Sequence, residues 1–194
     1  MEKKLSTREK ILLTATRLFY LKGYHAIGLN QIIKESGTPK GSLYHHFPNG
    51  KEQLAIEAIQ ASSNHVGEAI NRFMSEADSP LEGIQAHIQM IASVFENEES
   101  FNSETFSVVP FGLLATESAL ENENMRKACE EAFLYWESIY MRKLMSSGYE
   151  QEQAERIATA VNAMIEGGVT LALTQKSSEP LLRVGAMIPL LLQR

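Results

Sequence analysis

Residues 38–47, with the sequence TPKGSLYHHF, hold a dense set of side chains able to do chemistry. They supply a cation, hydroxyls and imidazoles, and they include no carboxylate. Groups of this kind hydrogen-bond to base edges and phosphate oxygens, whereas a carboxylate would repel phosphate. The segment therefore favours contact with a nucleic acid. The alternative is a short surface helix whose polar face is only solvated.

A helix over residues 38–47 divides them between two faces. Leu43 and Phe47 are four residues apart and form an apolar inner face. Gly41 lies on the outer face, although glycine costs about 1 kcal/mol relative to alanine inside a helix. A glycine is reasonable there if the backbone must approach a base closely. The outer residues that we expect to read base edges in a major groove are Lys40, Gly41, Ser42, Tyr44 and His45.

A longer helix is predicted before this segment. Ser6 and Glu9 have the capping-box spacing, and the apolar residues that follow recur at helical spacing. Gly23 then supplies the left-handed residue that commonly ends a helix. The first helix is thus expected to begin after Ser6 and to end near Lys22.

Two short helices are predicted next, joined by a tight turn. One covers residues 29–36 and stops at Gly37. The other is expected to be capped by Thr38, with Pro39 at its first helical position, and to run to Phe47. Two short helices with a glycine-containing turn, preceded by a longer helix, form the helix-turn-helix arrangement.

The rest of the chain is predicted to be helical as well. No period-2 alternation is long enough for a sheet, and residues 97–110 are expected to form a loop or a frayed helix. The further helices are expected at about 51–76, 79–96, 111–118, 123–146, 151–174 and 178–192. The predicted fold class is therefore all-α. An N-terminal three-helix, helix-turn-helix DNA-binding domain spans residues 1–50, and a C-terminal helical ligand-binding and dimerisation domain spans residues 51–194.

The charge of the chain is unevenly distributed. The 194 residues have a formal net charge of −6, yet the first 60 carry nine Lys and Arg against five Glu, a net of +4. The remaining residues carry a net of −10. A basic N-terminal segment on an acidic body suggests that the first part meets a polyanion. Uneven charge is also common in soluble proteins that bind no polyanion.

Several classes of enzyme and metal site are disfavoured. A single Cys can form neither an intramolecular disulfide nor a cysteine metal cage. Asp78 is the one Asp in the chain, so a Ser-His-Asp triad would have to recruit it. The five His show no HExxH spacing, and a phosphate loop ending at Lys51 would need its first glycine at His45. We expect no catalytic residue, no metal and no cofactor.

No membrane segment or secretory leader is expected. The N-terminus stays polar through Lys10 and lacks the apolar region of a signal peptide. The most apolar stretch, residues 157–174, contains Asn162 and Glu166 and is interpreted as a buried or interfacial helix. These features predict a cytoplasmic protein.

Aromatic residues are concentrated between about residues 90 and 141, which hold eight of the fifteen. Phe133, Trp136 and Tyr140 share one helix face and could line an apolar cavity for a flat ligand. His87 and Glu166 could supply polar groups, although lone polar residues in helices are more often structural. Ordinary core packing is the alternative for each aromatic residue. The candidate pocket residues are Phe95, Phe111, Phe133, Trp136, Tyr140 and Asn162.

The last two predicted helices suggest a homodimer. One contains small residues, among them Ala163, Gly167 and Gly168, and the next contains large apolar residues such as Leu182 and Met187. Small residues facing large ones permit close packing across a two-fold axis. A four-helix dimer interface is therefore expected.

Four motifs occur in unbroken order over about residues 6–57. Gly23-Tyr24, residues 29–37, residues 40–47 and residues 51–54 together resemble the DNA-binding domain of TetR-family transcriptional repressors. The rest of the chain is similar to the LmrA/YxaF-like subgroup of that family. The motifs that carry this second resemblance are residues 48–51, 112–115 and 162–168.

The resemblance implies an all-helical homodimer, with the N-terminal domain on double-stranded operator DNA and the C-terminal domain on an inducer. In this subgroup the inducers are flavonoid-like aromatics. Two positions depart from the family pattern. Gly28 stands where many members have a Thr that caps the second helix and meets phosphate, and Gly50 is an extra residue before Lys51. The candidate phosphate contacts are Asn30, Thr38, His46 and Lys51.

The sequence thus favours a DNA-binding transcriptional regulator, a dimeric repressor released from its operator by a small aromatic ligand, with no enzymatic activity. The alternative is a helical small-molecule carrier or enzyme that does not bind DNA. A helical adaptor for protein partners is a third reading, which the acid-free helix disfavours. Steep salt dependence of nucleic-acid binding would separate the first reading from the others.

Overall fold

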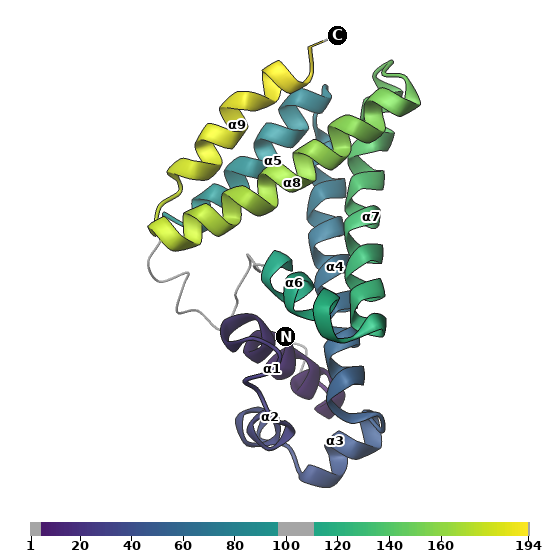
Figure 1. Cartoon of the computed structure of the whole chain (residues 1–194), viewed down its shortest axis with the longest axis vertical. Helices are drawn as coiled ribbons and strands as arrows, with labels where there is room; N and C mark the ends of the chain where they lie inside the picture. Colours follow the sequence, from purple (N-terminus) through teal and green to yellow (C-terminus); the bar gives the residue numbers. More distant parts are fainter. Residues whose placement is uncertain (1–4, 97–110, 194) are drawn as a thin grey trace. The chain divides into compact units, whose positions relative to one another are not determined.

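The computed structural model describes residues 5–96 and 111–193, with all of their side chains except those of residues 118–121. Within these ranges the chain forms helices and no strand (Figure 1), which confirms the predicted all-α fold class. The loop expected at residues 97–110 lies outside the described residues. The helices are α1 (Thr7–Lys22), α2 (Leu29–Ser36), α3 (Lys40–His46), α4 (Gly50–Glu76), α5 (Pro80–Val94), α6 (Phe111–Glu121), α7 (Glu123–Ser146), α8 (Gln151–Gln175) and α9 (Glu179–Leu191).

Packing divides the chain into two compact units. Unit 1 comprises residues 1–62 and 111–132, and unit 2 comprises residues 63–110 and 133–194. Helices α4 and α7 each contribute to both units. Unit 1 therefore takes in α6 and the first part of α7 in addition to the three N-terminal helices.

Local signals fix the ends of several helices as the sequence predicts. In the capping box of α1, Ser6 Oγ accepts a bond of 3.2 Å from the Glu9 amide, and Glu9 Oε2 accepts one of 2.7 Å from the Ser6 amide. Gly37 ends α2 in the left-handed conformation, with φ of 63°. Ser79 caps α5 by accepting a bond of 3.2 Å from the Glu82 amide.

Helix α3 begins one residue later than its predicted cap implies. Pro39 is the N-cap, in extended conformation, and the helix runs from Lys40 to His46. The hydroxyl of Thr38 is buried and shares a hydrogen bond of 2.8 Å with Ser36 Oγ. Thr38 is therefore committed to the turn and does not cap α3.

The core of unit 1 lies between α1 and the helices around it. Helix α1 packs against α2, α3 and α6. Burial of each large apolar side chain contributes about 1.5–3 kcal/mol, which is how these short helices are held. The fully buried side chains of this core include Ile11, Leu18, Phe19, Ile27, Ile32, Leu43, Phe47, Leu54 and Ile59.

In unit 2, α9 packs against α5 and α8 (Figure 1). Gly168 on α8 admits Leu181 of α9, because a Cβ at Gly168 would lie only 2.9 Å from Leu181 Cδ2. The small residue Gly168 and the large residue Leu181 thus pack together within one chain, where Leu181 is fully buried. This part of the predicted small-to-large packing does not lie between two chains. Leu182, Met187 and Leu190 stay exposed.

One helix in the described part of the chain, α8, is long and apolar enough to cross a membrane by length and composition. Its most apolar stretch is 44% buried within the chain. Core helices of soluble proteins meet the same two criteria.

Candidate nucleic-acid interface

Helix α3 has the two faces that its sequence predicts. Leu43 and the following Phe47 are fully buried and anchor the helix in unit 1. On the opposite face Lys40, Tyr44 and His45 are exposed, and the Tyr44 side chain keeps 44% of its surface in solvent. Gly41 is exposed as well, whereas Ser42 and His46 are half-buried. The outer face therefore presents an ammonium, a phenol and an imidazole with no carboxylate among them.

Gly41 is not required by the fold. A Cβ at this position would meet nothing within 4 Å, and the residue does not have positive φ. Glycine nevertheless lowers helix stability by about 1 kcal/mol relative to alanine. Because Gly41 has no side chain, its backbone is accessible on the outside of the molecule, next to Lys40 and Tyr44.

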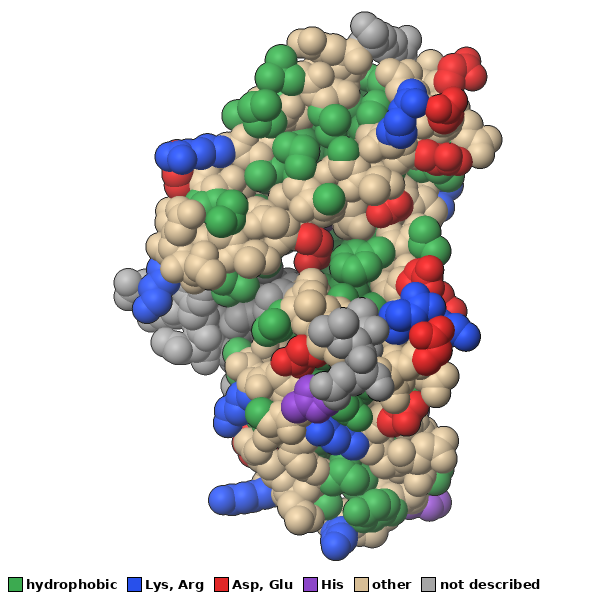
Figure 2. Space-filling view, in the orientation of Figure 1, with side chains coloured by type: hydrophobic (Ala, Val, Ile, Leu, Met, Phe, Trp, Pro, Cys, Tyr) green, Lys and Arg blue, Asp and Glu red, His purple; other side chains and the backbone are tan. Residues whose placement is uncertain are grey.

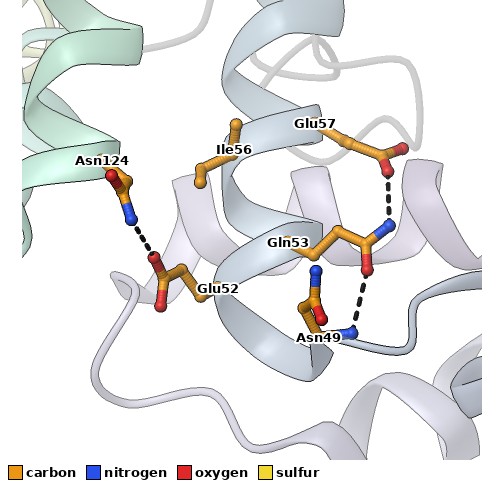
Figure 3. Close-up of a pocket in the computed structure, with 6 residues that line it drawn as sticks. All are labelled: Asn49, Glu52, Gln53, Ile56, Glu57 and Asn124. Atoms are coloured by element: carbon orange, nitrogen blue, oxygen red, sulfur yellow. Dashed lines mark hydrogen bonds between the residues drawn. The ribbon is translucent and has the colours of Figure 1, made fainter.

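A chain of contacts joins α3 to α1 and α4. The Arg8 guanidinium lies 5.0 Å from the centre of the Phe47 ring, and its Nη2 is 2.5 Å from Glu57 Oε2. Gln53 donates a bond of 3.0 Å to Glu57 Oε1 and accepts one of 3.0 Å from the Asn49 amide (Figure 3). The ion pair is partly exposed and so contributes modestly to stability. The bond from Asn49 to Gln53 ties the turn that follows α3 to the start of α4.

The sequence did not predict these contacts of Arg8, Gln53 and Glu57. Arg8 and Glu57 are 49 residues apart, and no local spacing links them. Gln53 and Glu57 stand four apart on α4, a spacing that favours a side-chain contact, and this was a signal available in the sequence.

The surface hollow beside this chain does not suit an anion. It has a volume of about 310 Å³ and includes the carboxylates of Glu52 and Glu57 (Figure 3). Glu52 Oε1 accepts a bond of 2.9 Å from Asn124 Nδ2. A phosphate would be repelled there, so the hollow belongs to the support of α3 and not to its outer face. Its lining residues are Asn49, Glu52, Gln53, Ile56, Glu57 and Asn124.

The candidate phosphate contacts differ in accessibility. Asn30 is exposed in the first turn of α2, whose N-cap Gly28 makes no side-chain cap bond. Thr38 is buried, as described above. The Lys51 ammonium lies 4.1 Å from the centre of the Tyr24 ring. Burial lowers the pKa of Lys51, while the negative charge of Glu117 acts in the opposite direction.

Unit 2 holds most of the aromatic residues predicted to line a pocket. Phe95, Trp136 and Tyr140 are buried, and the half-buried Phe133 makes an edge-to-face contact with Trp136 at 5.4 Å. The Trp136 indole N–H donates a bond of 3.0 Å to the carbonyl of Ser63. Phe111 is buried too, but it belongs to unit 1.

A neutral polar pair lies among these side chains. His87 Nδ1 and the Tyr140 hydroxyl are 2.8 Å apart, and both side chains are buried. Burial lowers the pKa of His87 to about 4. Burial also raises the pKa of Tyr140, with a further contribution from the charge of Glu166. Both rings are therefore uncharged near neutral pH.

The polar pocket candidate Asn162 is engaged by a neighbouring helix. Its amide donates a bond of 3.2 Å to Glu137 Oε1, and Thr159 donates one of 2.9 Å to Glu137 Oε2. A second surface hollow, of about 420 Å³, lies along α5 between Ser79 and Gln89. Neither this hollow nor the one beside α3 is lined by the predicted aromatic residues.

Two family descriptions match the chain. Residues 11–58 match "Bacterial regulatory proteins, tetR family", and residues 80–187 match "Transcriptional regulator LmrA/YxaF-like, C-terminal domain". The chain belongs to the TetR family of transcriptional regulators. The first match contains the whole of α2 and α3, so the outer face described above lies in the DNA-binding part of a TetR-family chain.

Full-length relatives agree with this assignment. The chain is 50% identical over 188 residues to the HTH-type transcriptional regulator YxaF of Bacillus subtilis, covering 97% of this chain and 96% of YxaF. It is also 50% identical over 188 residues to the HTH-type transcriptional regulator LmrA of B. subtilis, covering 97% of both chains. These TetR-family relatives are transcriptional regulators and not enzymes.

Solved structures show the same fold. A TetR transcriptional regulator from Legionella pneumophila superposes with a TM-score of 0.82 at 22% identity, over 100% of both chains. The reduced form of Escherichia coli NemR superposes with a TM-score of 0.77 at 22% identity, over 94% of this chain and 95% of NemR. In the described part of this TetR-family chain, no cluster of three or more His, Cys, Asp or Glu could hold a metal ion.

Proposed function

We propose that this TetR-family regulator is a dimeric repressor whose α3 reads operator DNA and which a small aromatic effector releases. The observation that carries the proposal is the acid-free outer face of α3, exposed above the buried Leu43 and Phe47. A lysine can pair with guanine O6 and N7, and hydroxyl and imidazole groups can meet either donors or acceptors in the major groove. The proposed base-reading residues are Lys40, Gly41, Ser42, Tyr44 and His45.

Contacts to phosphate would fix the register of α3 in the groove. Asn30 and His46 are proposed to make them, together with the free N–H groups at the start of α2. Lys51 would contribute its charge from beside the Tyr24 ring. Thr38 is proposed to act by holding the turn before α3, since its hydroxyl already bonds to Ser36.

A second copy of the chain is the proposed partner of α8 and α9. Leu171, Leu182, Met187 and Leu190 are exposed large apolar side chains on these helices, and Figure 2 shows hydrophobic surface gathered over them. Contiguous apolar surface of this kind marks interaction sites. A two-fold axis would place two copies of α3 in half-sites about 34–36 Å apart, one turn of DNA.

The effector is proposed to be small, flat and uncharged, of the flavonoid type that the LmrA/YxaF resemblance suggests. The aromatic residues of unit 2 would supply apolar contacts, and His87 and Tyr140 would supply uncharged hydrogen-bonding groups. Phe111 lies in the other unit, so the proposed pocket rests on Phe95, Phe133, Trp136, Tyr140 and Asn162. Residues 1–50 would thus serve DNA reading, and residues 51–194 effector binding and dimerisation, in the cytoplasm.

Release, and not activation, is proposed as the direction of the response. A 54-residue match at 35% identity, over 28% of this chain, is to Escherichia coli NemR, which is named a transcriptional repressor. An effector can shift the protein between two arrangements of α3 only by binding one of them more tightly.

The test is binding of the purified protein to the DNA directly upstream of its own gene, at two salt concentrations, with and without a panel of flavonoids. We expect sequence-specific binding that weakens steeply with salt and that at least one flavonoid abolishes. Lys40→Ala and Tyr44→Ala should weaken this binding without unfolding the protein. Specific binding that no compound changes would refute the effector class. Binding to no duplex, at this promoter or others, would refute DNA reading by α3.

A further inference from the structure

One carboxylate of α6 reaches the turn between α1 and α2. Glu117 Oε2 accepts a hydrogen bond of 3.0 Å from the backbone N–H of Tyr24, 93 residues earlier. Gly23 leaves room for this carboxylate, because a Cβ there would lie 2.8 Å from Glu117 Oε1. Gly23 also has φ of 81°, a backbone conformation that favours glycine. The conformation and the missing side chain together admit Glu117.

The same contact extends to the first turn of α4. The Tyr24 ring, held through its backbone by Glu117, lies under the Lys51 ammonium at 4.1 Å. The charge of Glu117 also favours the charged form of Lys51 against the effect of burial. Lys51 is the second residue of α4, just beyond the turn that follows α3. Glu117, Tyr24 and Lys51 therefore connect α6, the α1–α2 turn and the first turn of α4, which directly follows α3, all within unit 1.

The position of the Glu117 carboxylate depends on the charges and dipoles around it. The C-terminus of a helix carries partial negative charge, so a carboxylate beside it is unfavourable without compensation. Glu117 lies at the C-terminal end of α1, and its compensation comes from the Tyr24 N–H and the Lys51 charge. The hydrogen bond from Tyr24 and the charge of Lys51 thus offset the effect of the helix end on the Glu117 carboxylate.

We propose that Glu117 is a positioning residue for DNA reading. It holds the α1–α2 turn and, through the Tyr24 ring, keeps Lys51 in place in the first turn of α4, directly after α3. The two ends of the α2–α3 segment are thereby fixed, and α2 and α3 meet DNA as one rigid pair. Glu117 acts through Tyr24 and Lys51 and does not itself touch DNA. The inference rests on the proposed reading of DNA by α3.

The experiment uses the full chain and a duplex that the wild type selects from a random-sequence library. Glu117→Ala should weaken binding to that duplex by at least about 5-fold. Glu117→Gln keeps an acceptor for the Tyr24 N–H and should stay within about 2-fold of the wild type. Glu117 itself contacts no phosphate, so the slope of the salt dependence in Glu117→Ala should fall by no more than about 1, the share of the single phosphate contact proposed for Lys51. The matched control is Glu131→Ala, which removes an exposed carboxylate from α7 in the same unit.

A structural readout accompanies the affinities. Amide hydrogen exchange at Tyr24 should be faster in Glu117→Ala than in the wild type, while Tm falls by less than about 5 °C. If Glu117→Ala does not fold, Glu117→Asp keeps the charge but shortens the side chain by one methylene, and the same loss of affinity is expected from it.

Two results would overturn the inference alone. One is wild-type affinity in a Glu117→Ala variant whose Tyr24 amide exchanges faster, and the other is an equal loss of affinity in Glu117→Gln and Glu117→Ala. A wild type that selects no duplex would instead overturn the proposed function, and the inference with it.

Discussion

At the scale of single residues, Gly41 separates what helps folding from what helps binding. The fold offers room for a side chain at this position, and an alanine would suit the helix better. In the proposed function, the requirement for glycine comes instead from the close approach of the backbone to a base edge. The same position should therefore respond in opposite directions to tests of stability and of DNA binding.

Gly41→Ala is the corresponding prediction. The free energy of unfolding should rise by up to about 1 kcal/mol, because alanine is the better helix former. Affinity for the selected duplex should fall, because the new methyl group projects into the space that a base would occupy. Chemical denaturation and a DNA titration measure the two quantities on the same preparation. A variant that is more stable and binds as tightly as the wild type would contradict the role of Gly41.

His87 makes a second prediction, on the dependence of stability on pH. Burial lowers its pKa to about 4 in the folded chain, whereas the unfolded chain titrates near 6.5, so the unfolded state binds more protons below pH 6.5. The stability contributed by neutral His87 is present above about pH 6.5 and is lost as the pH falls toward 4. Between pH 7 and pH 5 the loss should be about 2 kcal/mol.

His87→Gln provides the comparison, because glutamine stays uncharged and can still pair with Tyr140. Unfolding free energies of both proteins at pH 7 and pH 5 give the difference directly. The variant should lose about 2 kcal/mol less than the wild type over this interval. Parallel losses in the two proteins would show that His87 does not titrate in this way.

At the scale of elements, local signals predict helices well, and distant contacts escape them. The capping box at Ser6, the stop at Gly37 and the cap at Ser79 act within four residues, so the sequence shows both partners at once. The inner face of α3 follows in the same way from the spacing of Leu43 and Phe47.

The contacts that escape prediction join residues far apart in the sequence. Arg8 with Glu57, His87 with Tyr140 and Tyr24 with Glu117 are separated by 49, 53 and 93 residues. Their pairing depends on how whole helices pack, and no periodicity within one helix encodes it. The start of α3 was mispredicted for a related reason, since the Thr38 hydroxyl bonds back to Ser36 and leaves the capping role to Pro39.

The packing of α7 against α4 at Trp136 gives an element-scale prediction. Trp136→Phe removes the indole N–H that bonds to the Ser63 carbonyl but keeps an aromatic ring in unit 2. DNA affinity should stay unchanged, because α3 is untouched. Release by an active flavonoid should need a higher concentration, which a titration of the preformed DNA complex measures. Release at the wild-type concentration would exclude Trp136 from the effector pocket.

At the scale of the whole molecule, the exposed apolar side chains of α8 and α9 bear on the oligomeric state of the protein. Leu190 is 56% exposed and lies on α9. Leu190→Glu would place two carboxylates near a two-fold axis in the proposed dimer. Sedimentation should then show a monomer, and DNA affinity should fall because one chain offers a single α3.

The control for this prediction is Leu134→Glu, which adds the same charge at a leucine of α7 that is 59% exposed. It should sediment and bind DNA like the wild type. If Leu190→Glu also remains dimeric, the dimer uses another surface.

The exposed face of α8 and α9 also bears on how operator occupancy depends on the amount of protein in a cell. Only a dimer carries two copies of α3, and the number of dimers follows the square of the number of free chains while monomers predominate. Doubling the copy number then multiplies the dimers by up to about four. If the proposed dimer forms through this apolar face, occupancy of the operator would therefore rise more steeply than in proportion to gene expression.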